Sequence, residues 1–402
     1  MKIRSITYFC NPQYPLEEKI LREAGSFLSK AKAAYEAAGY EVQTVRLATI
    51  PFPRILGEEN LNEVPQYTSQ LSKVIQEVGV AYASLGPALP ESPRSYQVIP
   101  EAIAADKNIF FGGVMADAQM IHMAQVKACA EIIVKCAPLS LNGFANLQFA
   151  SLANVKPGAP FFPAAYHDSD KSAFGIAVEC ADLAVDAFGG RGTVDEGRQI
   201  LVEEITKHGQ AIAKIAQDLR VPFKGVDFSL APFPDDAHSL GQAVENMGVP
   251  KIGLHGSLTA AAILTDAIER ADFPHIGFNG FMQPILEDSV LAKRAAEGVL
   301  TVKDALLYSA VCGTGLDTVP LAGDVTADEL TPLLLDLCAL ALRLDKPLTA
   351  RLMPVPGKKA GDATDFDFAF FANGRVMALD SSPLRGALND NVSFTLSKKI
   401  PR

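Results

Sequence analysis

Two polar segments of the sequence combine an acid or base with a strand-like apolar run. The run VDFSLAP at 226–232 delivers Asp227, and the run GLHG at 253–256 delivers His255. The predicted strand 226–230 delivers Asp227 to one side, and His255 lies at the carboxyl end of the predicted strand 252–255, where a general base or a ligand is held rigidly. We therefore interpret Asp227 and His255 as catalytic candidates. The alternative is that each is a hydrogen-bonded structural group, the commoner state of such residues.

A third candidate closes a Pro-rich segment. The segment 154–167 begins with Asn154 and ends with Tyr166 and His167 among aromatic residues. His167 is a candidate base or ligand, and Asn154 is a candidate substrate-binding residue. The alternative is a histidine that packs against Tyr166 and donates to a backbone carbonyl.

Two carboxylates flank a glycine-containing stretch further along the chain. The sequence CGTGLD at 312–317 supplies Cys312 and Asp317, and Asp324 follows seven residues after Asp317. Carboxylates in an extended loop can bind a divalent cation or act as an acid and base pair. We predict Asp317 as catalytic and both aspartates as metal ligands. The spacing matches no EF-hand and no zinc pattern, so the metal prediction depends on residue type alone.

Anion-binding groups are predicted in three further places. The run FGGRGT at 188–193 precedes a predicted helix, so Gly190 and Arg191 are candidates for holding a phosphate or carboxylate, with a plain capped turn as the alternative. Arg351 and Lys358 lie in a basic segment at 351–362 and are candidates for an acidic substrate. A solvated basic turn is the alternative there. Asn279, in HIGFNG at 275–280, would orient the substrate.

These residues lie between elements that alternate along the chain. Strands are predicted at 2–9, 41–47, 80–84, 109–114, 147–153, 175–178, 226–230, 252–255, 276–278 and 349–355. Helices are predicted between them, which is typical of an α/β fold with a mainly parallel sheet. The Asn-Gly pair at 373–374, between apolar runs at 368–371 and 375–379, predicts a C-terminal β-hairpin. No linker marks a boundary, so we expect a single domain over 1–402.

Composition limits the partners and the compartment. The 402 residues carry 36 Lys plus Arg against 46 Asp plus Glu, a formal charge of −10, which disfavours nucleic acid. The most apolar segment, 330–344, is shorter than the ~20 residues of a membrane span, so no membrane partner is expected. Six scattered cysteines indicate free thiols in a cytoplasmic protein. We also expect a homo-oligomer.

Several of these motifs together resemble one family. The runs at 226–232, 253–256, 312–317 and 351–362, with the segment 154–167, occur in the order seen in the domain of unknown function 711 family, also called uncharacterised protein family 0210. The similarity extends over most of the chain. It implies a fold like the pyruvate formate-lyase superfamily, a barrel of about ten strands made from two antiparallel halves and wrapped by helices. The glycyl radical motif of that superfamily is absent, so radical chemistry is not expected.

Two functions of different classes are consistent with these observations. The first is a barrel enzyme that acts on a small anionic metabolite by acid–base chemistry, with a divalent cation as an optional cofactor. The second is a non-catalytic ligand-binding or regulatory protein that retains the pocket. A purely structural subunit is a third interpretation. The family itself has no assigned reaction, so the resemblance does not choose among them.

Overall fold

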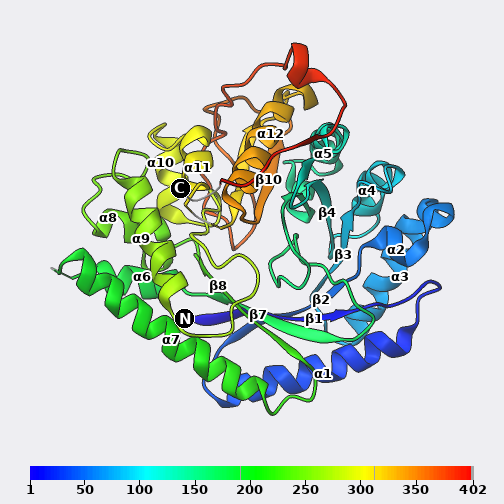
Figure 1. The fold of residues 1–402 in the computed structure, drawn as a ribbon, viewed down its shortest axis with the longest axis horizontal. Helices are drawn as coiled ribbons and strands as arrows, with labels where there is room; N and C mark the ends of the chain where they lie inside the picture. Colours follow the sequence, from blue (N-terminus) through cyan, green and yellow to red (C-terminus); the bar gives the residue numbers. More distant parts are fainter. Residues whose placement is uncertain (191, 312, 400–402) are drawn as a thin grey trace.

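The computed structural model describes residues 1–190, 192–311 and 313–399, which form an α/β fold around a mixed sheet of eleven strands (Figure 1). The main strand order is β8-β7-β1-β2-β3-β4-β6-β10-β9, and β5 and β11 extend it beside β4. The strands are β1 (Lys2–Cys10), β2 (Val42–Thr49), β3 (Tyr82–Ala88), β4 (Ile109–Ala116), β5 (Met120–Ile121), β6 (Phe149–Ala153), β7 (Ala173–Glu179), β8 (Phe223–Ala231), β9 (Gly315–Ala322), β10 (Leu348–Val355) and β11 (Phe394–Thr395).

The sheet contains strands of both directions, in blocks. Strands β1, β2, β3, β4 and β6 are parallel to one another. The parallel pair β7 and β8 joins β1 antiparallel, and the parallel pair β10 and β9 joins β6 antiparallel. The predicted alternation of strands and helices is confirmed.

The strand path does not close, so the predicted ten-stranded barrel is not confirmed. The segment 274–285 lies against both edge strands instead. The amide of Ile276 donates to the carbonyl of Val226 in β8 (3.1 Å), and the amide of Ile285 donates to the carbonyl of Asp317 in β9 (3.0 Å). These contacts leave isolated bridges in place of a continuous ladder.

Helices surround the sheet, with α1 and α7 lying along the side of β1, β2 and β8 (Figure 1). They are α1 (Glu18–Ala37), α2 (Phe52–Leu56), α3 (Val64–Glu77), α4 (Arg94–Ala105), α5 (Met123–Cys136), α6 (Ala181–Phe188), α7 (Val194–Ala216), α8 (Leu240–Asn246), α9 (Ser257–Arg270), α10 (Ser289–Ala296), α11 (Val302–Tyr308) and α12 (Ala327–Leu344). Short 3₁₀ turns are η1 (Glu58–Glu63), η2 (Ala137–Leu139), η3 (Phe144–Gln148), η4 (Asp236–His238) and η5 (Gly386–Asn389). In the described part of the chain, none of the helices combines the length and the apolar character of a membrane span.

Amphipathic sequence and end-capping explain the longer helices. Helix α1 buries Leu21, Leu28 and Tyr35, at intervals of seven residues, against the sheet. Helices α7 and α12 each begin with a capping box, in which a threonine side chain and a glutamate three residues later satisfy free backbone amides. The large core lies between these helices and the sheet.

Several strand pairings contain β-bulges or register shifts, and those in β1, β9 and β8 lie next to charged residues. In β1, Arg4 is an extra residue between the pairs Ile3–Val178 and Ser5–Ala177 with β7. In β9, Asp317 and Thr318 lie opposite the single residue Arg351 of β10, and Thr318 has φ +41°. The register of β8 against β7 also shifts after Asp227. Bulges bend a strand and re-aim its side chains, and they are frequent near binding sites.

Three sequence-based element predictions are wrong. Residues 252–255 and 276–278 form turns with isolated bridges, because Gly253 (φ +108°), Gly256 (φ +106°) and Gly277 (φ +82°) take left-handed backbone angles. The stretch that contains Asp317, expected to be a loop, is the buried strand β9.

The predicted C-terminal hairpin is also absent from the described residues. The segment 366–371 is not a strand, and only Ala363 and Arg375 form an antiparallel bridge. A two-residue type I′ turn needs positive φ at both central residues, and neither Asn373 nor Gly374 has it. The Asn373 side chain instead accepts from the amide of Phe366 (2.8 Å) and donates to its carbonyl (2.9 Å), which closes a wider loop.

Candidate functional site

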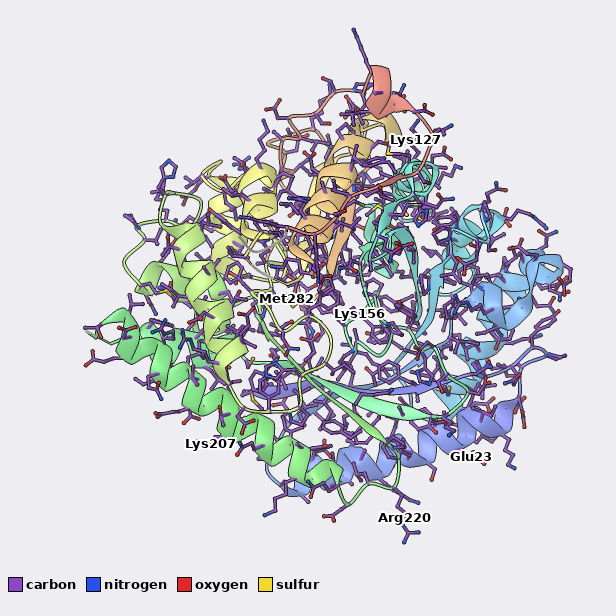
Figure 2. The ribbon with its side chains drawn as sticks, viewed as in Figure 1. Glu23, Lys127, Lys156, Lys207, Arg220 and Met282 are labelled. Atoms are coloured by element: carbon purple, nitrogen blue, oxygen red, sulfur yellow. The ribbon has the colours of Figure 1, made fainter. Side chains whose placement is uncertain are left out.

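A cavity of about 390 Å³ lies at one end of the sheet. Its walls come from the amino ends of β1, β2 and β3, the start of β4, and the carboxyl ends of β7 and β8. These ends meet because β7 runs antiparallel to β1. Met282, which lines the cavity, lies near the middle of the molecule in Figure 2, whereas Lys207 and Arg220 lie at its periphery. The volume is that of a small-molecule site.

Four charged side chains form a buried chain beside this cavity. Arg4 contacts Glu287, and the Nη2 of Arg351 donates to Oε1 of Glu287 (2.8 Å). The Nε of Arg351 donates to Oδ1 of Asp317 (2.5 Å). Arg4, Arg351 and Glu287 line the cavity, and Asp317 lies behind Arg351. The bulged strand β1 thus supplies Arg4 at one end of this row of ion pairs, and the bulged strand β9 supplies Asp317 at the other end.

The two carboxylates of this chain have opposite pKa shifts. Burial alone would raise the pKa of Glu287, but the charges of Arg4 and Arg351 on either side lower it below its usual range. Burial raises the pKa of Asp317, and the single contact with Arg351 does not reverse that effect. The Oδ2 atom of Asp317 is buried without a hydrogen-bond partner among the described residues.

Arg46 differs from the other arginines of the cavity. Its Nε donates to Oγ1 of Thr44 (2.9 Å), and its guanidinium lies 5.0 Å from the ring centre of Phe162 and 5.8 Å from that of Tyr82. Within the residues that the structure describes, no carboxylate pairs with Arg46 and its terminal nitrogens donate to no protein acceptor. Burial, together with the charge of Arg4, lowers the pKa of Arg46 to about 9.

Register explains the place of Arg46. On β2 it lies beside Thr7 of β1 and beside Tyr82 of β3. Side chains that are level on neighbouring strands point to the same face. The arginine and the tyrosine therefore both face the cavity, and both line it.

Two groups of aromatic rings also line the cavity. The first aromatic group is Tyr82, Phe110 and Phe162, whose neighbouring rings are 5.5 and 5.6 Å apart. The second aromatic group is Phe144, Phe368 and Phe370, with neighbouring rings 5.1 and 5.3 Å apart. Among the described residues no ring pair joins one group to the other. Each group therefore presents ring surface to the cavity.

Asp227 is the other buried carboxylate of the cavity wall. Its Oδ1 accepts from the amide and the hydroxyl of Ser229 and from the amide of Asn279, and its Oδ2 accepts from the amide of Phe278 (2.9 Å). Burial raises the pKa of Asp227, against the opposing effect of these hydrogen bonds. The carboxylate therefore fixes the segment 274–285 against β8 while it faces the cavity.

The cavity carries an excess of cations in an acidic protein. Its lining includes Arg4, Arg46, Lys107 and Arg351, but only the carboxylates of Asp227 and Glu287. The whole chain has a formal charge of −10. A local reversal of sign in a cleft attracts an anion.

Two of the sequence-predicted residues line this cavity, and two others support its wall. Asp227 and Arg351 line it, and Asp317 binds Arg351 from behind. Asn279 (φ +48°) does not line it, but its Oδ1 accepts from the amide of Phe228 (2.8 Å), so it supports the wall beside Asp227.

The two histidine candidates lie elsewhere. His255 is exposed in the turn before α9, because its segment is not a strand. His167 is buried, and its Nε2 is 2.9 Å from the carbonyl oxygen of Lys171, as in the packing alternative. Burial lowers the pKa of His167, and its Nδ1 has no hydrogen-bond partner among the described residues.

The remaining predicted binding residues are also outside the cavity. Asn154 (φ +54°) lies after β6 near Asp345 and Lys346. Lys358 donates to the carbonyl of Ala363 and pairs with Asp365 in a surface turn, as in the alternative of a basic turn. Gly190 is exposed in a second hollow beside the start of α7. The predictions for Arg191 and Cys312 fall outside the described residues.

The predicted metal ligands are not brought together. Asp317 is buried within β9, whereas Asp324 is exposed in the turn after that strand. The ion pair that the Asp317 side chain forms in the described part of the chain is with a cation, Arg351. Across the described residues, no cluster of three or more His, Cys, Asp or Glu side chains has a metal-binding arrangement.

The sequence reasoning missed Arg4, Arg46 and Glu287. A weak signal existed for Arg46, which stands directly between the apolar residues Val45 and Leu47. Arginine is seldom buried unless it is paired or binds a ligand. Arg4 gave a weaker signal because strand alternation alone does not reveal a bulge.

Comparison with known proteins identifies the family. The family model described as "Uncharacterised ACR (DUF711)" matches residues 1–373. The chain belongs to the DUF711 family. A UPF0210 protein of Pyrobaculum islandicum is 30% identical over 373 residues, which cover 86% of this chain and 80% of that protein. One of Ruminiclostridium cellulolyticum is 28% identical over 397 residues, covering 92% and 88%, and one of Pyrobaculum aerophilum is 34% identical over 282 residues, covering 65% and 59%.

The family assignment agrees with the resemblance of the motifs and goes no further. The DUF711 description names no reaction, and neither do the names of these relatives. Function must therefore be argued from the cavity itself.

Proposed function

We propose that this DUF711 protein binds a small monoanionic molecule in the cavity, with Arg46 as the group that takes the negative charge. The observation that carries the proposal is the state of Arg46. Arg46 lines a small-molecule cavity, and its terminal nitrogens lack protein acceptors among the described residues. A planar guanidinium offers two parallel N–H donors to a carboxylate.

The neighbouring cations support a monoanion over a more highly charged ligand. Arg4 and Arg351 already share Glu287, and Arg351 also holds Asp317. Among the described residues, Arg46 is therefore the one arginine of the cavity lining that is not paired with a carboxylate. One guanidinium matches one carboxylate in charge and in geometry.

A second candidate function is acid–base catalysis on that anion, and Asp227 is the observation that favours it. Asp227 faces the same cavity as Arg46, and burial raises its pKa, as in many catalytic carboxyl groups. The four hydrogen bonds that it accepts also suit a purely structural role. Turnover of a bound anion, lost in Asp227→Asn with binding retained, would establish the catalytic function.

The test of the binding function is isothermal titration calorimetry with butanoate and with its uncharged analogue butanamide. The expected result is one site for butanoate and at least about tenfold weaker binding of the amide, because a charged hydrogen-bonded pair is lost. Arg46→Gln should abolish the preference for the anion. If butanoate and butanamide bind the native protein equally, the proposal is refuted.

Arg54→Gln is the matched control. The Arg54 side chain is 57% exposed and pairs with Glu91 away from the cavity lining. This change removes one positive charge from the protein, as Arg46→Gln does. Equal losses in the two variants would mean that general charge, and not the site, governs binding.

Other aspects of the sequence interpretation stay predictions. A barrel-like closure of the sheet through the segment 274–285 would fit its contacts with β8 and β9. The cytoplasmic location and the homo-oligomeric state also stay predictions. A divalent cation has no support from the arrangement of the described carboxylates.

A further inference from the structure

We infer that the ligand of this cavity is a small aryl carboxylate, with its carboxylate on Arg46 and its ring held by the two aromatic groups. The inference rests on the proposed anion-binding function and specifies its substrate class. It depends on an additional observation, the arrangement of rings around the guanidinium of Arg46.

The surroundings of Arg46 fix the position of the ligand's charge. Arg46 lies over Phe162 and beside Tyr82, so one face of its guanidinium is occupied by aromatic ring. Its Nε is occupied by Thr44. The edge that carries the terminal nitrogens is left for the ligand, and that edge presents two donors in one plane. A carboxylate bound there lies in the same plane as the guanidinium.

Aromatic surface lies next to this carboxylate position. The first aromatic group begins beside Arg46 and continues to Phe110, and Phe162 contacts both Arg46 and Phe110. An anion on Arg46 therefore has ring surface directly beside it. A flat ligand attached to the carboxylate can make offset or edge-to-face contacts there, and such contacts favour an aromatic ring over an aliphatic one.

The second aromatic group lines the same cavity. Its rings come from η3 and from the segment 366–371, and Phe368 contacts both Phe144 and Phe370. The two groups line one cavity without a ring pair between them among the described residues. A ligand ring that touches both groups would gain edge-to-face or tilted ring contacts from each, like those within the groups. The cavity volume of about 390 Å³ limits this ligand to a small molecule.

The ion pairs of Arg4 and Arg351 indicate which ligand charge the cavity favours. Because Arg4 and Arg351 are already neutralised by Glu287 and Asp317, a dianion would bring a second negative charge close to Glu287. Lys107 is the fourth cation of the cavity lining, but it is exposed on the loop before β4, so solvent screens its charge. The buried carboxylate of Glu287 therefore favours a monoanionic carboxylate over a phosphate.

The test compares benzoate, cyclohexanecarboxylate, benzamide and phenyl phosphate by isothermal titration calorimetry on the full chain. Benzoate should bind roughly 2- to 10-fold more tightly than cyclohexanecarboxylate, which is the gain in affinity expected from one aromatic contact. It should also bind more tightly than benzamide and phenyl phosphate. Phe162→Leu and Phe368→Leu should each bring the benzoate-to-cyclohexanecarboxylate ratio towards one.

Phe27→Leu is the control for these variants. Phe27 packs against Tyr8 and Phe174 and does not line the cavity, so this change should leave the ratio as in the native protein. Phe368 is only partly buried, so its variant should fold, which far-ultraviolet circular dichroism checks.

The outcomes separate the two proposals. If cyclohexanecarboxylate binds as well as benzoate and both need Arg46, the aryl inference is wrong and the anion-binding function stands. If phenyl phosphate binds more tightly than benzoate, the assignment to a carboxylate is wrong. If benzamide matches benzoate and butanamide matches butanoate, both proposals fail.

Discussion

Replacement of Arg46 by methionine should stabilise the protein while it removes ligand binding. The arginine is partly buried with one hydrogen bond, from Nε to Thr44, and its terminal nitrogens lack protein acceptors among the described residues. Burial of a charge without a partner costs several kcal/mol, and partial exposure reduces that cost. Methionine keeps an unbranched apolar stem against Phe162. We expect the free energy of unfolding to rise by about 1–2 kcal/mol.

Urea unfolding followed by far-ultraviolet circular dichroism measures this change, since the chain contains no tryptophan. The slope of the unfolding free energy against urea must be the same in native and variant proteins for the comparison to hold. Arg54→Met, at an exposed ion pair with Glu91, should change the unfolding free energy by less than about 0.5 kcal/mol. If Arg46→Met loses more than about 1 kcal/mol, Arg46 is a structural residue and its assignment as the ligand-binding cation is refuted.

Glu287→Gln should lower the free energy of unfolding, measured in urea, by about 3–5 kcal/mol, because Arg4 and Arg351 lose their shared carboxylate. The control is Glu91→Gln at an exposed ion pair, which should change the free energy of unfolding by less than about 1 kcal/mol. The lowered pKa of Glu287 stabilises the native state above the usual glutamate value of about 4.3, and this contribution disappears as the pH falls through the native-state pKa. The difference in unfolding free energy between native protein and Glu287→Gln should therefore shrink below about pH 4; a difference that grows there contradicts the assignment. Asp227→Asn should cost about 1–3 kcal/mol, since an amide NH₂ would face a backbone N–H donor, and a neutral result would show that the carboxylate does not fix the segment 274–285. His255→Ala should leave both butanoate affinity and the unfolding free energy within about 0.5 kcal/mol of the native values, because the side chain is exposed, and a loss of binding would return His255 to the site.

The strands were predictable where the signal was local. Apolar and polar alternation identified β1, and a continuous apolar run identified β4. The alternation of strands with helices predicted a mainly parallel sheet but no strand order. The strand β9 was missed because three glycines and two carboxylates suggested a loop, and burial on both faces is not visible in such a sequence. The strand predicted at 252–255 is wrong for the opposite reason. An apolar run suggested a strand there, but left-handed glycines interrupt it.

The candidate site was predictable only in part, for a related reason. Asp227 was found because a carboxylate in a predicted strand stands out, and Arg351 because a basic segment stands out in an acidic protein. Arg4 was not found, because its direction depends on a bulge against β7, a strand that lies far away in the sequence. His255 was preferred because it followed an apolar run, but the turn that exposes it depends on Gly253 and Gly256.

The contact between Arg4 and Glu287 joins positions 283 residues apart. During synthesis the amino-terminal arginine leaves the ribosome long before its carboxylate exists, and Arg351 is made later still. A nascent chain that ends before residue 287 therefore carries cationic strands β1 and β2 without the carboxylate that neutralises Arg4. The ion pairs beside the cavity therefore cannot be complete until residues 287 and 351 have been synthesised.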